Sequence, residues 1–139
     1  MKTGIAAGQA LEQRWERIGL GVRCAYNPQR PELLQHYVQA GRGLSRLQPA
    51  QEARVQRRML ELLLQTAADE ALPWHWRAAS LEHTAWPLAR LTSLLEGPAV
   101  AVEHDLGQRV QQAWDLLGLP PKATLATSDM HRPEPHAGR

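Results

Sequence analysis

Apolar residues recur every three or four positions along most of this chain, and prolines divide the pattern into short blocks. This spacing places the apolar side chains on one face of an α-helix. The first predicted helix runs from Ala10 to Tyr26, and Asn27-Pro28 ends it because a residue that precedes proline disfavours the helical conformation. Its apolar face consists of Leu11, Trp15, Ile18, Val22 and Ala25.

Two further blocks follow the same pattern. Pro31 is placed to start the second helix, where the missing backbone N–H is no loss. Gln48-Pro49 separates this helix from the third, and the short link predicts an antiparallel hairpin. The inward residues expected are Leu34, Tyr37, Val38, Gly41, Leu44 and Leu47 in the second helix, and Val55, Met59, Leu62, Leu63, Thr66 and Ala67 in the third.

The remaining pattern predicts two more helices and a tail. A fourth helix is expected from Leu72-Pro73 to about Glu96, with a kink or a restart near Trp86 because Pro87 removes a backbone donor. A fifth, from about Ala99, carries Val102, Leu106, Val110, Ala113 and Leu117 on one face. The expected fold is all-α: a single bundle of about five helices over residues 8–119, the fourth kinked at Pro87, with a flexible, disordered C-terminal tail at 120–139.

Composition agrees with helices and excludes several classes of protein. Twenty-one Leu and twenty Ala stand against two Ile, six Val, two Tyr and no Phe, which disfavours strands. A chain of 139 residues that is 43% hydrophobic and 22% charged is typical of one globular domain, and excludes a multidomain machine or a membrane channel.

Cysteine content and the N-terminus indicate location. Cys24 is the only cysteine, so no disulfide can form within the chain, and a lone thiol fits a reducing compartment. The apolar stretch at residues 3–8 is too short for a signal peptide, and no window reaches the ~20 apolar residues of a membrane span. We therefore expect a cytoplasmic protein that does not enter a membrane.

Charge is distributed unevenly along the chain. Residues 1–58 carry a net charge of +6, residues 59–119 carry −5, and residues 120–139 carry +1. Oppositely charged halves that pack together would neutralise each other. The alternative is that the second and third helices present a basic surface that binds the phosphates of a nucleic acid. Because the sequence contains no helix-turn-helix or other DNA-binding motif, nucleic-acid binding is the weaker hypothesis. That surface would consist of Arg42, Arg46, Arg54, Arg57 and Arg58.

Four histidines are the candidate metal ligands: His36, His75, His83 and His104. On one helix, His75 and His83 would lie about 12 Å apart, too far to share an ion. Glu32 and His36 have a four-residue spacing that could clamp one ion, and His104 could add a ligand from the last helix. No Glu is followed three residues later by His, as in di-iron bundle proteins. One hypothesis is therefore that these histidines bind iron, manganese or haem. The other is that they are ordinary helix residues whose side chains form hydrogen bonds with backbone or carboxylate groups.

Tryptophans gather in the fourth helix. Trp74, Trp76 and Trp86 could form an aromatic platform for a partner, with Arg77 adding a guanidinium beside it. In a chain without Phe, however, tryptophans also serve as the large residues of the core. These four residues are the candidate partner-binding site.

Motifs for catalysis are missing from the sequence. There is no Gly-x-Ser-x-Gly elbow and no glycine-rich phosphate loop, and Cys24 has no identifiable general base. Because Cys24 adjoins the inward stripe, the sequence predicts a buried, unreactive thiol. No catalytic residue is assigned, and the sequence favours a protein that is not an enzyme.

Three runs of the sequence resemble the small FagA family of pseudomonads. They are Val22-Arg23-Cys24-Ala25-Tyr26-Asn27-Pro28, then Glu32-Leu33-Leu34-Gln35-His36-Tyr37 with Gly41-Arg42, and Ala71-Leu72-Pro73-Trp74-His75-Trp76-Arg77. The resemblance covers roughly residues 10–96 and implies a cytoplasmic protein that is encoded beside an iron-independent fumarase and a manganese superoxide dismutase and is induced when iron is scarce. It implies no molecular activity and no site residues. The expectation is a non-enzymatic accessory protein of the iron-starvation response that acts through a protein partner.

Overall fold

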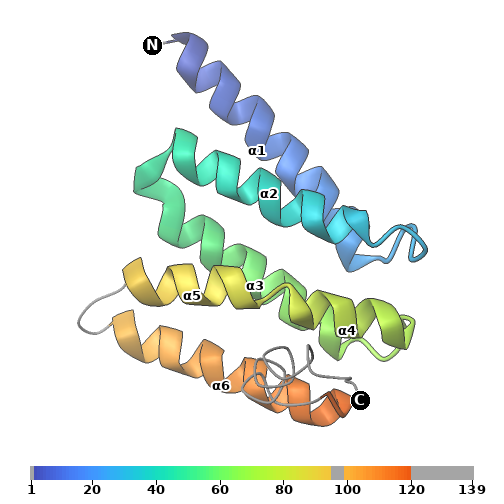
Figure 1. Ribbon diagram of the computed structural model, residues 1–139. Coiled ribbons are helices and arrows are strands. Elements are labelled where there is room, and N and C mark those ends of the chain that lie inside the picture. Colours follow the sequence, from blue (N-terminus) through green and yellow to red (C-terminus); the bar gives the residue numbers. More distant parts are fainter. Residues whose placement is uncertain (1, 95–98, 120–139) are drawn as a thin grey trace, which may run out of the picture.

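The computed structural model describes residues 2–94 and 99–119, with side chains described at 6–94 and 105–119. Within these residues the chain forms six α-helices and one short 3-10 helix, and no strand (Figure 1). The all-α class expected from the sequence is confirmed. The helices are α1 (Lys2–Arg23), α2 (Glu32–Leu47), η1 (Pro49–Gln51), α3 (Glu52–Ala68), α4 (Trp74–Glu82), α5 (Ala85–Leu94) and α6 (Ala99–Leu117).

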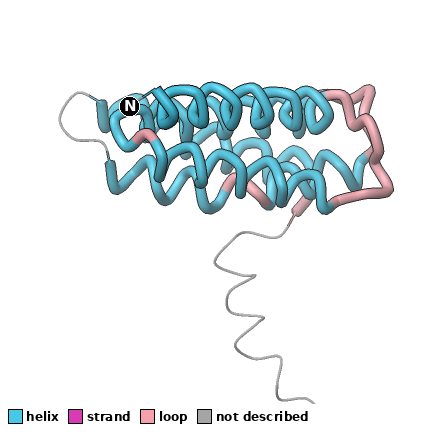
Figure 2. Tube along the Cα trace, turned by 90° about the horizontal axis from the view of Figure 1, so that it is seen from above, coloured by secondary structure: helices cyan, strands magenta, loops and turns pink. Residues whose placement is uncertain are grey.

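Helix α3 is the centre of the fold. It packs against α1, α2, α4, α5 and α6. Viewed from above, the helices form two layers joined by loops at their ends (Figure 2). A helix with neighbours on several sides needs apolar residues on more than one face, and α3 supplies them.

Buried side chains form two clusters that share α3. Val55, Met59 and Leu63 join residues of α1, α2 and α4 in the first cluster. Leu60, Leu64 and Ala67 join residues of α4, α5 and α6 in the second. Leu60 and Leu64 follow Met59 and Leu63 directly, and a helix turns by about 100° per residue, so consecutive residues point to different clusters.

The first helix is longer at its start and shorter at its end than the sequence predicts. It begins at Lys2 rather than Ala10 and ends at Arg23 rather than Tyr26. Within the added turns, Gly8 lies against the side chain of Gln48: a Cβ there would lie 2.3 Å from Nε2. At the other end, Ala25 adopts φ 50°, which is outside the right-handed helical region.

The second and third helices match the prediction closely. Of the residues expected to face inward in α2, only Leu47 differs, being 44% exposed at the last helical position. Thr66 is buried and donates its hydroxyl proton to the Leu62 carbonyl at 2.7 Å. A buried residue not expected from the pattern is Trp114, which packs in the second cluster.

The fourth predicted helix is two helices. Helix α4 ends at Glu82 and α5 begins at Ala85, so the break lies at His83–Thr84 and not at Pro87 (Figure 1). Pro87 is the third residue of α5, a position where a backbone N–H has no partner within the helix. The restart near Trp86, which the sequence offered as the alternative to a kink, is therefore what the chain adopts, and the described residues contain six α-helices where the sequence predicts five.

Candidate partner-binding surface

Trp76 lies in the core. Its side chain is fully buried, and its indole Nε1 donates a hydrogen bond to the carbonyl oxygen of Val22 at 2.8 Å. The bond satisfies the only polar group of the indole and joins α4 to the end of α1. Trp76 therefore cannot contact a partner, which corrects its assignment to an exposed aromatic platform.

Trp74 and Trp86 reach the surface at different places. Trp74 is 54% exposed and borders a hollow of about 410 Å³ between the end of α3 and the end of α6. Arg77 borders the same hollow, and its Nε donates to the carbonyl of Ala67 at 2.8 Å. Trp86 is half-buried and borders a separate hollow. The predicted platform of three indoles does not form, since residues two apart on a helix point in different directions.

The hollow beside Trp86 combines an aromatic ring with arginines. We call it the Trp86 hollow; its volume is about 380 Å³, and it is lined by Arg42, Ser45, Arg46, Pro49, Glu52, Trp86 and Arg90. The guanidinium carbon of Arg42 lies 4.6 Å from the centre of a Trp86 ring, a cation–π contact between α2 and α5.

One of the three arginines of the Trp86 hollow is paired. Arg90 donates two hydrogen bonds to Glu52, one from Nη2 to Oε1 at 2.9 Å and one from Nε to Oε2. The hydrogen bond from Arg90 holds the pKa of Glu52 below its ordinary value, against a smaller opposing effect of burial. Arg42 and Arg46 have no ion-pair partner among the described residues. The hollow thus keeps two uncompensated positive charges.

The basic surface predicted on the second and third helices is smaller in the structure. Arg54 forms an ion pair with Glu12 at 3.4 Å, and Arg58 forms one with Glu16 at 3.2 Å. Arg57 is half-buried, and its Nε has no hydrogen-bond partner. Only Arg42 and Arg46 remain as free exposed cations of the predicted set, and both border the Trp86 hollow.

Ion pairs join the two oppositely charged halves of the chain at Arg23 and Asp69. Nη1 of Arg23 donates to Oδ2 of Asp69 at 2.8 Å, and the backbone N–H of Ala71 donates to Oδ1 at 3.0 Å. These two hydrogen bonds hold the pKa of Asp69 below its ordinary value. The pair of Arg90 with Glu52 also joins the halves, but with the acid in the basic half, and Arg109 with Glu61 at 2.9 Å forms within one half. Packing of opposite halves therefore accounts for only part of the charge balance.

The histidines lie apart. His36 is exposed, and it borders a small hollow with Glu32. Nε2 of His75 lies 3.1 Å from the carbonyl oxygen of Pro28, and Nδ1 of His83 lies 2.8 Å from that of Ala79. His104 belongs to α6, but its side chain is outside the described residues. Among residues 6–94 and 105–119, no three His, Cys, Asp or Glu side chains come together as a metal site would require.

Cys24 is exposed, which corrects the prediction of a buried thiol. The buried neighbours are Val22 and Ala25, and a residue two positions after Val22 points to a different side of the helix. In the part of the chain that the structure describes, no helix combines the length and the apolar character needed to cross a membrane.

Two features of the Trp86 hollow were not predicted from the sequence. One is Arg90, which follows Trp86 by four residues and so lies on the same helical face; this spacing could have indicated it. The other is Glu52, whose pairing with Arg90 spans 38 residues and has no signal in local sequence.

Comparison with known proteins gives no match: no protein family matches the chain, and neither a curated protein nor a solved structure shows significant similarity to it.

Proposed function

We propose that this protein is a non-enzymatic accessory protein of the iron-starvation response in the cytoplasm, and that it docks an acidic segment of a protein partner in the Trp86 hollow. The iron-starvation role is supported by the resemblance of residues 10–96 to the FagA family. The docking role is supported by the chemistry of the hollow.

The contact between Arg42 and Trp86 carries the docking proposal. Arg and Trp are enriched among the few residues that dominate binding energy at protein interfaces. Here the guanidinium of Arg42 lies 4.6 Å from a Trp86 ring centre, beside the exposed Arg46. The stacking orders two side chains before a partner arrives, so less conformational entropy is lost on binding.

Charge selects the kind of partner. Arg42 and Arg46 lack carboxylate partners among the described residues, whereas Glu52 is already bonded to Arg90. An Asp or Glu side chain of a partner can therefore bind the free guanidiniums without breaking an existing pair. Positive potential at the hollow also raises the rate of encounter with an acidic surface.

Site-specific crosslinking in iron-starved cells tests the proposal. A photoreactive amino acid replaces Pro49, an exposed uncharged residue of the hollow, in one variant and Gln13, an exposed residue of α1 outside the hollow, in the control. We expect a protein partner to crosslink at position 49 during iron starvation, and not at position 13. Equal crosslinking at both positions, or none at 49, would contradict docking at the hollow.

Charge reversal is the second test of docking at the Trp86 hollow. The double variant Arg42→Glu, Arg46→Glu is expected to lose the partner, while Arg14→Glu, Arg17→Glu, with the same change in net charge on α1, retains it. Elemental analysis of the purified wild-type protein tests the alternative function, the binding of a metal ion or haem. A stoichiometric metal ion, or bound haem, would favour the metal-binding histidines over the accessory role.

A further inference from the structure

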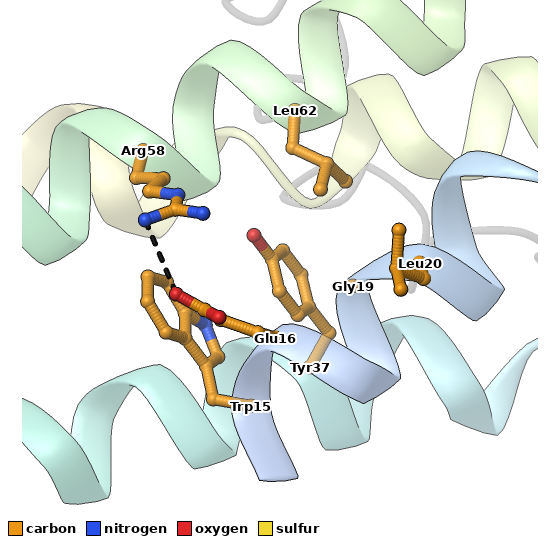
Figure 3. Close-up of a pocket in the computed structure, with 7 residues that line it drawn as sticks. All are labelled: Trp15, Glu16, Gly19, Leu20, Tyr37, Arg58 and Leu62. Carbon is orange, nitrogen blue, oxygen red and sulfur yellow. Dashed lines mark ion pairs between the residues drawn. The ribbon is translucent and has the colours of Figure 1, made fainter. Parts of the chain in front are cut away.

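A second hollow, of about 170 Å³, opens between α1 and α3, with Tyr37 of α2 at its base (Figure 3). We call it the Trp15 hollow. Trp15, Glu16, Gly19 and Leu20 of α1 form one side, and Arg58 and Leu62 of α3 form the other. The rings of Trp15 and Tyr37 stack with centroids 5.9 Å apart and planes 6° apart. The hollow is therefore walled by rings and aliphatic carbons, with polar groups at a few points.

The Tyr37 hydroxyl has no hydrogen-bond partner in the part of the chain that the structure describes, although the residue is only 2% exposed. Figure 3 shows this hydroxyl pointing into the gap between Arg58 and Leu62. The oxygen itself is not among the fully buried side-chain atoms that lack a partner, so solvent reaches it through the hollow. A ligand oxygen that enters the hollow can therefore replace water as the hydrogen-bond partner of Tyr37.

Tyr37 can act as the donor. Burial raises the pKa of its hydroxyl above the ordinary value, and the nearby charges of Arg58 and Glu16 have smaller, opposite effects. The group stays protonated at neutral pH. It can donate to an oxygen of a ligand and also accept a proton from one.

The mouth of the Trp15 hollow carries a balanced charge. Arg58 and Glu16 form an ion pair at 3.2 Å, with side chains about half exposed. A charged ligand would have to compete with one member of this pair, whereas a neutral ligand leaves it intact. The electrostatics of the site favour a neutral molecule.

Gly19 determines how closely the walls of the Trp15 hollow approach each other. A Cβ at position 19 would lie 2.9 Å from Cε1 of Tyr37 and 3.2 Å from Cδ1 of Leu62. The absence of that atom lets the tyrosine ring and Leu62 approach α1 closely. The remaining space matches one aromatic ring, because an apolar cavity of ~150 Å³ in another protein binds benzene.

We propose that the Trp15 hollow binds a neutral single-ring aromatic molecule with one hydroxyl group, a phenol, whose ring lies against the apolar walls and whose oxygen pairs with the Tyr37 hydroxyl. This site uses residues of α1, α2 and α3 that the Trp86 hollow does not. Its occupancy is independent of the partner proposed above.

Phenol and toluene are the matched probes, because they differ only in a hydroxyl for a methyl group. Each is titrated into the full-length protein while the Trp indole N–H signals are followed by NMR, with the Trp15 signal identified from a Trp15→Phe variant. We expect saturable binding of phenol that shifts the Trp15 signal, and weaker binding of toluene. The Tyr37→Phe variant should bind phenol roughly fivefold more weakly than wild type, the loss expected for one hydrogen bond, with toluene affinity unchanged.

Tyr26→Phe is the control variant, since Tyr26 is the only other tyrosine and is 84% exposed. It should bind both probes like wild type. Retained toluene binding by Tyr37→Phe shows that this variant is folded and the hollow intact. The proposal is overturned if phenol does not bind, if phenol and toluene bind equally, or if Tyr37→Phe binds phenol as wild type does.

Discussion

Gly41 marks the closest approach of α2 to the core. A Cβ at this position would lie 2.3 Å from the sulfur of Met59, which is fully buried, and 3.1 Å from Nε1 of Trp15. Gly41→Ala is expected to lower the free energy of unfolding by about 1–3 kcal/mol, because a packed core accepts an added methyl group only by shifting side chains. Urea denaturation measures the change.

Gly43 supplies the matched control on the same helix. A Cβ there would meet only Cδ2 of Leu11, at an ordinary contact distance of 3.7 Å. Alanine is a better helix former than glycine, so Gly43→Ala should raise stability by up to ~1 kcal/mol. If both substitutions change stability in the same direction, the close contact at Gly41 is not what makes glycine necessary there.

Asp69 makes stability depend on pH in the acid range. Its pKa is lowered in the folded state by the hydrogen bonds from Arg23 and the Ala71 N–H, so the folded protein binds this proton more weakly than the unfolded chain does. The contribution to stability is present above the ordinary carboxyl pKa of about 4 and is lost as pH falls through the lowered value. Asp69→Asn should therefore show a smaller loss of stability than wild type between pH ~5 and ~2.

Thermal unfolding across this pH range tests the role of Asp69. The neighbouring Glu70→Gln removes one carboxylate from an exposed position and serves as the control. If Asp69→Asn shows the same dependence of stability on pH as wild type, the pair with Arg23 does not stabilise the folded state.

Predictions for single residues failed where a contact with a residue far away in the sequence determines which side chain is buried. The sequence indicates that Trp74 and Trp76 point in different directions, since they are two apart on a helix. It does not indicate which of the two is buried. That choice depends on the carbonyl of Val22, which accepts the Trp76 indole proton from 54 residues away.

At the scale of the element, local hydrogen bonds fix the break between α4 and α5. The buried Thr84 donates its hydroxyl proton to the Leu81 carbonyl at 2.6 Å, and the backbone N–H of Leu88 donates to the Thr84 carbonyl at 3.0 Å. Thr84→Val keeps the shape of the side chain but leaves the Leu81 carbonyl without this donor. The Leu81 carbonyl keeps the backbone N–H of Thr84 at 3.1 Å, so we expect a loss of about 0.5–1.5 kcal/mol in the free energy of unfolding, the net contribution of one hydrogen bond.

Thr92→Val in α5 is the comparison for Thr84→Val. Thr92 also donates its hydroxyl proton to a helix carbonyl, that of Leu88 at 2.8 Å, but it is exposed, and water can replace the bond. Its substitution should change stability by less than about 0.5 kcal/mol. Equal losses for both variants would mean that the hydroxyl of Thr84 does not hold the break.

Helices whose ends are set by nearby residues were predictable. The start of α2 after Pro31 and the end of α6 at Gly118 follow local signals, and Gly118 adopts φ 73° as a helix-ending glycine does. The start of α1 at Lys2 follows no such local signal. The break at His83–Thr84 was displaced from the proline that signals it, because proline is tolerated in the first turn of a helix.

The whole molecule is built as two clusters on the two sides of α3. The first contains the stacked Trp15 and Tyr37 and borders both the Trp15 hollow and the α2 surface. The second holds α5 and α6 against α3. Trp86 of α5 packs against the first cluster and Arg42 of α2 stacks on it, so the Trp86 hollow depends on how α5 is held against α2. Sequence periodicity identifies the apolar faces of α3 but not which neighbour covers each face.

Adjacent leucines of α3 separate the contributions of the two clusters. Leu63 is buried in the first cluster and Leu64 in the second, so Leu63→Ala and Leu64→Ala make the same chemical change one residue apart. Each should cost about 2–5 kcal/mol, since a cavity replaces packed methyl groups. Amide hydrogen exchange distinguishes them: Leu63→Ala should speed exchange mainly in α1 and α2, and Leu64→Ala mainly in α5 and α6, because local opening follows the contacts that are lost. Faster exchange across all helices in both variants would instead show that the clusters unfold as one cooperative unit, and that α3 couples every helix packed on it.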